Sequence, residues 1–255
     1  MPLPHPETSS SADLSDRVVL VTGSSGGLGR AITMACAARG ATVVLHGRVV
    51  RKLEALYDEV LAAGHPEPTI LPLDLATATA EDFANVASAL QSQHGRIDAI
   101  VHTAVQLGSL GPIEHQAFEA WLSTMRVDLL APFGLTRGLL PLLRAAPDAS
   151  VIFTLDTRGE EPKAYWGAYA VAKAGLSALL AILADEWEHA PQLRVNGVVP
   201  GPMHSPLRLQ THPGDDNARL PLPEAFVPLY LYLLDGQPKA ESGHVIDAQA
   251  WLQRR

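Results

Sequence analysis

The segment that decides the fold is residues 17–40, RVVLVTGSSGGLGRAITMACAARG. It opens with an apolar run of the kind found in strands covered on both faces. A glycine-rich turn follows, and then a stretch of small residues with helical spacing. Glycines allow the backbone to approach a pyrophosphate closely, and the first turn of the next helix offers free N–H groups. The segment therefore predicts a strand, a phosphate-binding turn and a helix, although the glycines alone would also suit a plain strand-to-helix turn.

Short apolar runs alternate with longer Ala- and Leu-rich stretches along the rest of the chain, which is typical of repeated βαβ units. We expect strands at 17–22, 41–46, 69–73, 97–102, 150–155, 193–199 and 244–248. We expect helices at 28–39, 49–63, 79–94, 114–144, 164–189 and 223–235. The prolines and glycines of 200–222 break this periodicity, so that stretch is expected to be a long loop that acts as a lid or binds substrate.

These elements predict a single-domain α/β Rossmann fold: a doubly wound, mainly parallel seven-stranded sheet with helices on both faces. We expect the domain to occupy 16–255. The Pro-, Ser- and acid-rich residues 1–15 are expected to form a flexible N-terminal arm.

The composition of the chain indicates which kinds of partner and which cellular compartment to expect. A net charge of −8 disfavours nucleic acid as a partner, because neutralising phosphates requires clustered Lys and Arg. No stretch was expected to reach the roughly 20 apolar residues that span a bilayer, so a membrane partner is not expected. The single Cys36 cannot form an intrachain disulfide, which fits a reducing, cytoplasmic setting. The histidines show no metal-binding spacing, and no metal is expected.

The TGxxxGxG spacing of the turn resembles the short-chain dehydrogenase/reductase superfamily. The resemblance extends over about residues 15–250, through LDL (73–75), YAVAK (169–173) and RVNGVVPGPMHS (194–205). It implies that a nicotinamide cofactor is bound by the glycine-rich turn, the ends of the next strands, the YxxxK pair and the PG turn. These residues are Thr22, Gly23, Ser24, Ser25, Gly27, Leu28, Gly29, Arg48, Asp74, Leu75, Thr103, Ala104, Tyr169, Lys173, Pro200, Gly201 and Ser205.

The end of the second strand bears on cofactor choice. An acidic residue there would accept a bond from the ribose 2′-OH and favour NAD. This chain has Gly47 at that position, followed by Arg48, whose guanidinium suits a 2′-phosphate. NADP(H) is therefore favoured over NAD(H), although Arg48 could also be a solvated loop charge.

The catalytic pair predicted by the resemblance is Tyr169 and Lys173. A spacing of four places both side chains on one face of a helix, where the ammonium group is expected to lower the pKa of the phenol. Tyr169 then serves as a general acid or base for hydride transfer to or from a carbonyl or alcohol substrate. The resemblance also assigns Lys173 a bond to the nicotinamide ribose.

Two catalytic positions depart from the family pattern. Asp156 stands where the family carries a serine, 13 residues before the tyrosine, and Asp128 stands where it carries an asparagine. If ionised, Asp156 would raise the pKa of Tyr169 and weaken reduction. If protonated in an apolar pocket, it could donate a hydrogen bond to a carbonyl, as in ketosteroid isomerase, a worked case of the same chemistry. Thr154 shares its face of the strand and, like Thr157, is a substitute hydroxyl.

Two functional hypotheses follow. The first is an active NADP(H)-dependent oxidoreductase, and the second is a cofactor-binding protein with degenerate or altered catalysis, supported by the two aspartates and by Val105 in place of a glycine. In either case the helices around 118–144 and 165–188 are more apolar than one core-facing side requires. They predict a homodimer or homotetramer.

Overall fold

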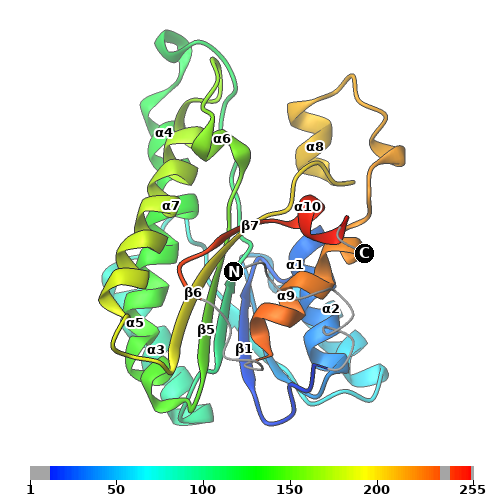
Figure 1. Ribbon diagram of the computed structural model, residues 1–255, viewed down its shortest axis with the longest axis vertical. Coiled ribbons are helices and arrows are strands. Elements are labelled where there is room, and N and C mark those ends of the chain that lie inside the picture. The colour runs from blue at the N-terminus through cyan, green and yellow to red at the C-terminus, as the bar shows by residue number, and fades with distance from the viewer. Residues whose placement is uncertain (1–11, 236–241, 254–255) are drawn as a thin grey trace.

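The computed structural model describes residues 12–235 and 242–253, and within these ranges the chain forms one sheet flanked by helices (Figure 1). The strand order is β3-β2-β1-β4-β5-β6-β7, and every neighbouring pair is parallel. The strands are β1 (Val18–Thr22), β2 (Thr42–Gly47), β3 (Thr69–Pro72), β4 (Ala99–His102), β5 (Ala149–Thr154), β6 (Leu193–Val199) and β7 (Val245–Asp247). The predicted seven-stranded Rossmann sheet is confirmed, and it is parallel throughout.

Helices cover both faces of the sheet, as expected. One face packs against α1 (Gly27–Ala38), α2 (Val50–Ala62), α9 (Val227–Leu234) and α10 (Ala248–Leu252). The other packs against α3 (Ala80–His94), α5 (Ala131–Ala145) and α7 (Gly167–Glu186). Figure 1 shows α3, α5 and α7 to the left of the sheet and α1, α2 and α9 to its right. Because both faces are covered, strands such as β1 are buried at every position, which explains their continuously apolar sequences.

The helix expected at 114–144 is interrupted. It consists of a short 3₁₀ turn, η2 (Ile113–His115), then α4 (Phe118–Met125), a π-helical turn, η3 (Arg126–Leu130), and α5. Pro132 lies two residues after the end of the π turn, in the first turn of α5. A proline has no N–H to donate and its ring crowds the carbonyl four residues earlier, which here belongs to Asp128. The wider turn relieves this clash, and it presents Asp128 to the interior.

The loop expected at 200–222 contains more structure than was predicted. Ser205 caps a short helix, α8 (Pro206–Thr211), by accepting a hydrogen bond from the N–H of Arg208. The 3₁₀ turns η4 (Asn217–Arg219) and η5 (Pro223–Phe226) follow, and η5 leads into α9. A Ser at the N-cap followed by a Pro at the first helical position is a recognised start signal, and it overrides the surrounding loop composition.

Residues 12–15, which were expected to belong to a flexible arm, lie on the body of the protein. Ala12 and Leu14 are buried in the core against α1, and the N–H of Leu14 donates to the carbonyl of Arg39. Apolar burial of Leu14 holds these residues on the body of the protein. Residues 1–11 lie outside the described residues.

One helix corrects the expectation about apolar stretches. By length and composition α7 is apolar enough to cross a membrane, with a mean hydropathy of 1.6 over its best window. The core helix of a soluble protein passes the same test, so this is weak evidence for a span. In this fold α7 packs on the sheet and on α4 and α6 (Thr157–Glu160), and it carries Tyr169 and Lys173.

Candidate active site

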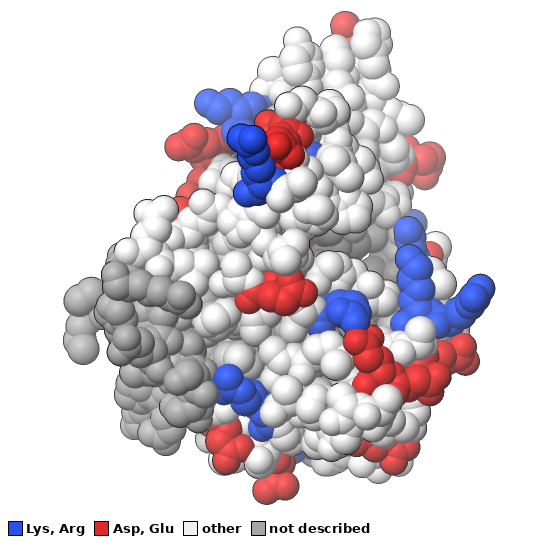
Figure 2. Space-filling model, turned by 90° about the vertical axis from the view of Figure 1, so that its right-hand side faces the viewer, with Lys and Arg blue, Asp and Glu red and all other residues white. Residues whose placement is uncertain are grey.

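A cavity of about 500 Å³ lies at the carboxyl edge of the sheet. It lies where the strand order reverses between β1 and β4, which is where doubly wound sheets bind their ligands. Its walls are the glycine-rich turn, the residues that follow β4 and β5, the start of α7 and the segment 200–212. Figure 2 shows the side of the molecule that carries α8, where the surface is hollowed below the upper lobe and acidic and basic side chains are interspersed.

The glycine-rich turn is packed too tightly for side chains. A Cβ on Gly29 would lie 2.3 Å from the carbonyl oxygen of Gly23 and 2.7 Å from Oγ1 of Thr103. Gly23 itself has a φ of +67°, and a Cβ there would meet the backbone of Ala104 at 3.0 Å. The turn therefore depends on glycine both for its conformation and for its close packing on β4.

The N-terminus of α1 faces the cavity without a cap of its own. Gly26 is the N-cap and makes no side-chain cap bond, and the first turn has no acidic residue. Gly27 and Leu28 line the cavity. Open N–H groups and a partial positive charge at a 12-residue helix suit the pyrophosphate of a dinucleotide. The residues present thus fit the cofactor that the fold implies.

Side chains from neighbouring strands hold this turn in place. Oγ1 of Thr22 accepts hydrogen bonds from the N–H groups of Thr103 and Ala104, both at 3.1 Å, and the Thr103 hydroxyl donates to the Thr22 carbonyl. On the other side, the N–H and the hydroxyl of Ser24 both donate to the carbonyl of His46, at 3.0 and 3.1 Å. These bonds tie the end of β1 to β4 and β2.

The predicted cofactor residues fall into two groups. Those that line the cavity are Gly23, Gly27, Leu28, Gly29, Thr103, Tyr169, Lys173, Pro200, Gly201 and Ser205. Those outside its wall are Thr22, Ser24, Ser25, Arg48, Asp74, Leu75 and Ala104. Thr22 and Ser24 are buried beneath the turn and act on its backbone, so their hydroxyls support the site from behind.

Arg48 and Asp74 follow β2 and β3, the two strands beyond β1 on the same edge. Both are exposed. The Asp74 carboxylate accepts the N–H of Ala76 at 3.0 Å, which fixes the turn after β3. Within the described residues, the Arg48 side chain has no hydrogen bond or ion pair. Both residues lie outside the cavity wall, and Arg48 directly follows the last residue of β2.

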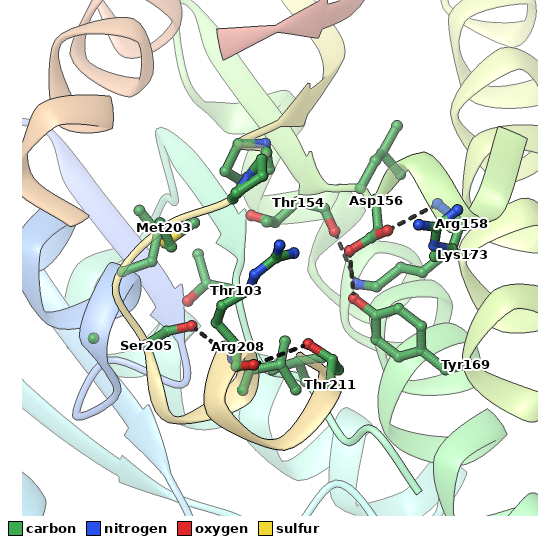
Figure 3. A pocket seen from close by; sticks show the side chains of 18 of the residues that line it. Thr103, Thr154, Asp156, Arg158, Tyr169, Lys173, Met203, Ser205, Arg208 and Thr211 are labelled. Atoms are coloured by element: carbon green, nitrogen blue, oxygen red, sulfur yellow. Dashed lines mark hydrogen bonds between the residues drawn. The ribbon is translucent and has the colours of Figure 1, made fainter. Parts of the chain in front are cut away.

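The predicted catalytic pair comes together inside the cavity (Figure 3). Tyr169 and Lys173 are both 3% exposed and share one face of α7, as their spacing predicts. The Tyr169 hydroxyl donates to Oδ2 of Asp156 at 2.9 Å. Nζ of Lys173 donates to the carbonyl of Thr154 at 2.9 Å and lies 5.6 Å from the centre of the Tyr169 ring.

The pKa of Tyr169 moves in the opposite direction to the one expected from Lys173. Burial of the phenol raises this pKa well above its ordinary value of 10, and the charges of Asp156 and Asp128 and the hydrogen bond to Asp156 raise it further. Each of these effects disfavours the phenolate. Burial and the two aspartates therefore outweigh any lowering by Lys173, and the net shift has the direction expected of an ionised Asp156.

Asp128 is buried in the π-helical turn and is 1% exposed. Its Oδ1 accepts the N–H of Gln106 at 2.7 Å, while its Oδ2 is buried with no hydrogen-bond partner within the described residues. Burial raises the pKa of Asp128 from 3.8 to about 7, against smaller lowering effects from Lys173 and from the Gln106 N–H. Asp128 does not line the cavity, so it acts on Tyr169 through its charge.

The two threonines considered as substitute hydroxyls both line the cavity. The Thr154 hydroxyl pairs with the Tyr230 hydroxyl of α9 at 3.0 Å. The Thr157 hydroxyl lies 3.5 Å from Oδ1 of Asp156. Thr154 is therefore already engaged, and Thr157 is the freer of the two.

Sequence reasoning did not single out several residues of the wall. Arg158, Arg208 and His212 line the cavity together with Trp166. Trp166 lies 5.8 Å from Tyr169 and 6.0 Å from His212, ring centre to ring centre. The Ser205–Pro206 start signal predicts a helix that carries Arg208, so this residue could have been found from the sequence. No sequence motif marks Arg158.

Two buried histidines stand at strand ends near the site. Burial lowers the pKa of His46 to about 4 and that of His102 to about 3, so both are neutral. His102 pairs with the Thr136 hydroxyl at 3.0 Å and stacks on Phe153. No group of three or more His, Cys, Asp or Glu side chains that could hold a metal ion occurs in the described part of the chain.

Known proteins resemble this chain over nearly its whole length. The short chain dehydrogenase family model matches residues 17–215. An uncharacterized oxidoreductase of Escherichia coli K12, YciK, is 36% identical over 92% of this chain and 93% of its own length. A Shigella flexneri chain assigned to the short chain dehydrogenases and solved with NADP has 35% identity and a TM-score of 0.90, over 94% of this chain and 100% of that chain. An Escherichia coli CFT073 counterpart solved with NADPH has 36% identity and a TM-score of 0.88, over 92% and 97%.

Proposed function

We propose that this chain, which belongs to the short-chain dehydrogenase family, is an NADP(H)-dependent oxidoreductase that reduces a carbonyl substrate with Tyr169 as proton donor. The observation that carries the proposal is the position of the Tyr169 hydroxyl. It is buried at the wall of a cavity that also contains Lys173 and the uncapped N-terminus of α1. A proton donor and a dinucleotide-binding turn therefore share one enclosed space.

The cofactor would be held at both ends of the cavity. The open N–H groups of α1 suit the pyrophosphate, and Lys173 would bind the nicotinamide ribose, as the family resemblance implies. The free guanidinium of Arg48 suits a 2′-phosphate. Two similar structures were solved with NADP and NADPH, which favours the phosphorylated cofactor. When bound, the reduced cofactor supplies the hydride.

The protonation state of Tyr169 is the one that reduction of a carbonyl requires. Because the pKa of Tyr169 is raised, its hydroxyl keeps its proton across the ordinary pH range. A protonated phenol can donate to the oxygen of a carbonyl as that oxygen gains negative charge. Oxidation of an alcohol would need the phenolate, which burial and Asp156 both disfavour. Tyr169 thus carries the proton that reduction consumes, but its raised pKa also makes it a weaker donor, as expected beside an ionised Asp156.

A second candidate function rests on one observation, the bond between Tyr169 and Asp156. The phenol donates its proton to a carboxylate instead of pointing it at a free position in the cavity. An ionised carboxylate beside the reacting oxygen would also oppose the negative charge that develops there. We therefore keep the alternative that this chain binds the cofactor with degenerate or altered catalysis.

We propose that the protein works as a homodimer or homotetramer. The described faces of the α4–η3–α5 helix and of α7 carry exposed apolar side chains, and such surface is commonly covered by a second copy. These side chains are Phe118 (73% exposed), Leu130 (50%), Phe133 (48%), Val171 (48%) and Ile182 (55%). Light scattering of the purified protein is expected to give two or four times the mass of one chain.

A cytoplasmic setting belongs to the same proposal. Cys36 is the one cysteine of the sequence, and its thiol is fully buried with a pKa raised to about 12. A buried thiol of this kind acts as a small apolar side chain and has no need of an oxidising compartment. Cell fractionation measures this directly, and recovery with the membrane pellet after a salt wash would contradict it.

The deciding experiment is a carbonyl screen with both cofactors. We expect NADPH to be oxidised in the presence of a subset of aldehydes and ketones, and NADH to be used less well. Cofactor binding is measured separately by the change in NADPH fluorescence. Binding of NADPH without turnover of any carbonyl would favour the altered-catalysis alternative, and absence of binding would contradict both.

A further inference from the structure

The charges that line the cavity are unevenly balanced. Three cationic side chains reach its wall, those of Arg158, Lys173 and Arg208, against the single carboxylate of Asp156. Figure 3 shows Asp156, Arg158, Tyr169 and Lys173 grouped on one side of the cavity, with Arg208 rising from the opposite wall. A cavity with an excess of cations favours an anionic ligand.

Most of these charges are already engaged by the protein. Oδ1 of Asp156 accepts the backbone N–H of Arg158 at 2.8 Å, and its Oδ2 accepts the Tyr169 hydroxyl. Lys173 donates to the Thr154 carbonyl. Arg208 forms an ion pair with Asp215, with Nε 2.8 Å from Oδ2. Neither Asp156 nor Arg208 therefore offers a free charge to a ligand.

The Arg158 guanidinium is the exception. Its Cζ lies 5.1 Å from the centre of the Trp166 ring, and within the described residues its side chain makes no hydrogen bond or ion pair. Stacking on an indole fixes the plane of a guanidinium but uses none of its N–H groups. The following acids, Glu160 and Glu161, are exposed and do not line the cavity. The N–H groups of the Arg158 guanidinium are therefore held in position at the cavity wall without an acceptor from the described residues.

Arg158 is joined to the reacting group through two neighbours. Its backbone N–H donates to the Asp156 carboxylate, which also accepts the Tyr169 hydroxyl. The Trp166 ring packs against both Arg158 and Tyr169. The cofactor pyrophosphate is accounted for elsewhere, by the glycine-rich turn at the start of α1. An anion bound by Arg158 in this cavity would therefore be a group of the substrate.

We propose that the substrate is a carbonyl compound that carries a carboxylate, an oxo acid, and that Arg158 binds this carboxylate. The inference rests on the proposed carbonyl reduction at Tyr169. A planar guanidinium held by an indole matches a carboxylate through two parallel N–H···O bonds. Reduction of the carbonyl leaves this group unchanged, so the product is the corresponding hydroxy acid.

The test compares short oxo acids with their methyl esters, which lack the negative charge and add one methyl group. The acids are chosen with the carbonyl at different distances from the carboxylate. With saturating NADPH, we expect the unaltered protein to prefer an acid over its ester. Arg158→Gln is expected to raise KM for that acid at least about tenfold, with kcat and the ester kinetics little changed. Arg158→Lys should restore part of the loss, because it restores the charge without the fork.

Arg219→Gln is the matched control, because Arg219 is an arginine outside the cavity that pairs with Asp216 and is largely exposed. It should leave the acid and ester kinetics unchanged. Unchanged NADPH binding by Arg158→Gln shows that this variant is folded. Equal use of acid and ester by the unaltered protein, or an equal loss for both in Arg158→Gln, would overturn the inference while the proposed function stands.

A binding measurement separates the two proposals if no carbonyl is reduced. Calorimetry then measures the oxo acid and its ester against the protein saturated with NADPH. Acid binding that is lost in Arg158→Gln supports the anion site even though the proposed reduction has failed. Acid binding that persists unchanged in Arg158→Gln, or is absent from the unaltered protein, overturns the inference.

Discussion

The two ends of the cavity are held by different kinds of contact. At the glycine-rich end, backbone groups and small hydroxyls fix the geometry, as in the bonds of Thr22 to Thr103 and Ala104. At the α7 end, charged and titratable side chains do so, and two of them, Asp156 and Asp128, depart from the family pattern. In the proposed function, the first end binds the pyrophosphate of the cofactor, which does not change during the reaction. The second must respond to charge that appears during it.

This difference predicts that the two ends can be altered independently. Replacing a polar side chain at the α7 end should change turnover or pH dependence and leave cofactor affinity nearly constant. A change at the glycine-rich edge should change cofactor affinity and leave the chemistry of the bound complex nearly constant. Measuring cofactor binding and turnover for the same variants therefore tests the comparison directly.

The largest effect is expected for Tyr169→Phe. Removing the hydroxyl removes the proposed proton donor, and loss of a general acid typically lowers the rate by about 10²–10⁴. The aromatic ring and its packing on Trp166 are kept, so the NADPH dissociation constant should change little. Single-turnover oxidation of bound NADPH measures the first quantity and a fluorescence titration the second. Unchanged turnover would remove Tyr169 from the mechanism.

The next effect is on stability, from Asp128→Asn. The pKa of this buried carboxyl is about 7 in the folded protein against an ordinary 3.8, so between these values the folded state keeps a proton that the unfolded chain has released. Stability therefore falls as pH rises through this window, and the ionised form costs up to about 4 kcal/mol above it. Asparagine keeps the bond from the Gln106 N–H and carries no charge.

Urea denaturation at several pH values measures this effect. We expect Asp128→Asn to be more stable than the unaltered protein above pH about 7, with the difference shrinking as pH falls toward about 4. Asp16→Asn, at an exposed carboxylate before β1, is the matched control and should show no such trend. A constant difference at every pH would show that packing, and not charge, distinguishes the two side chains.

A smaller effect is expected for Asp156→Ser, which restores the hydroxyl of the family pattern. The carboxylate that accepts the Tyr169 proton is removed, and a donor for the carbonyl oxygen is gained. Turnover of a neutral ketone at neutral pH should rise by about 10², the value of one such donor.

Asp156→Asn separates the two contributions, since the amide removes the charge but keeps the size of the side chain. If the unaltered protein is fast at neutral pH and Asp156→Ser slows it, the carboxylate is a working part of a changed mechanism. The interpretation of the site as degenerate would then be wrong. NADPH affinity should be the same in all three proteins.

The sequence was sufficient for the parts of this structure that depend on local pattern. Continuously apolar runs located the strands because the sheet is covered on both faces, and the spacing of Tyr169 and Lys173 placed them on one face of α7. The π turn at 126–130 was missed although Pro132 marks it. The helix α8 was also missed, although Ser205 and Pro206 form a normal start signal.

Other features depend on three-dimensional surroundings that no local pattern encodes. The direction of the Tyr169 pKa shift comes from its burial and from its bond to Asp156, and both require the folded distances. Counting residues located Asp156, but it could not tell that its two oxygens are shared between Tyr169 and the N–H of Arg158. That the Arg158 guanidinium is left without a partner among the described residues can be recognised only from the hydrogen bonds and ion pairs that the neighbouring charged groups make in the folded protein.

The smallest effect is expected at the other end of the cavity, for Arg48→Ala. Arg48 is exposed and follows β2, where a 2′-phosphate would be bound, and no acidic residue occupies that strand end. Solvent screens an exposed charge pair, so the loss of NADPH affinity should be about tenfold at most and should shrink at high salt. NADH affinity should not change, because NADH lacks the phosphate. Arg51→Ala, three residues further on in the first turn of α2 and also exposed, is the matched control. Fluorescence titration of both cofactors against the three proteins decides the matter: equal losses for NADPH and NADH, or no loss for either, would mean that Arg48 does not bind the 2′-phosphate, and the preference for NADP(H) would need another residue to explain it.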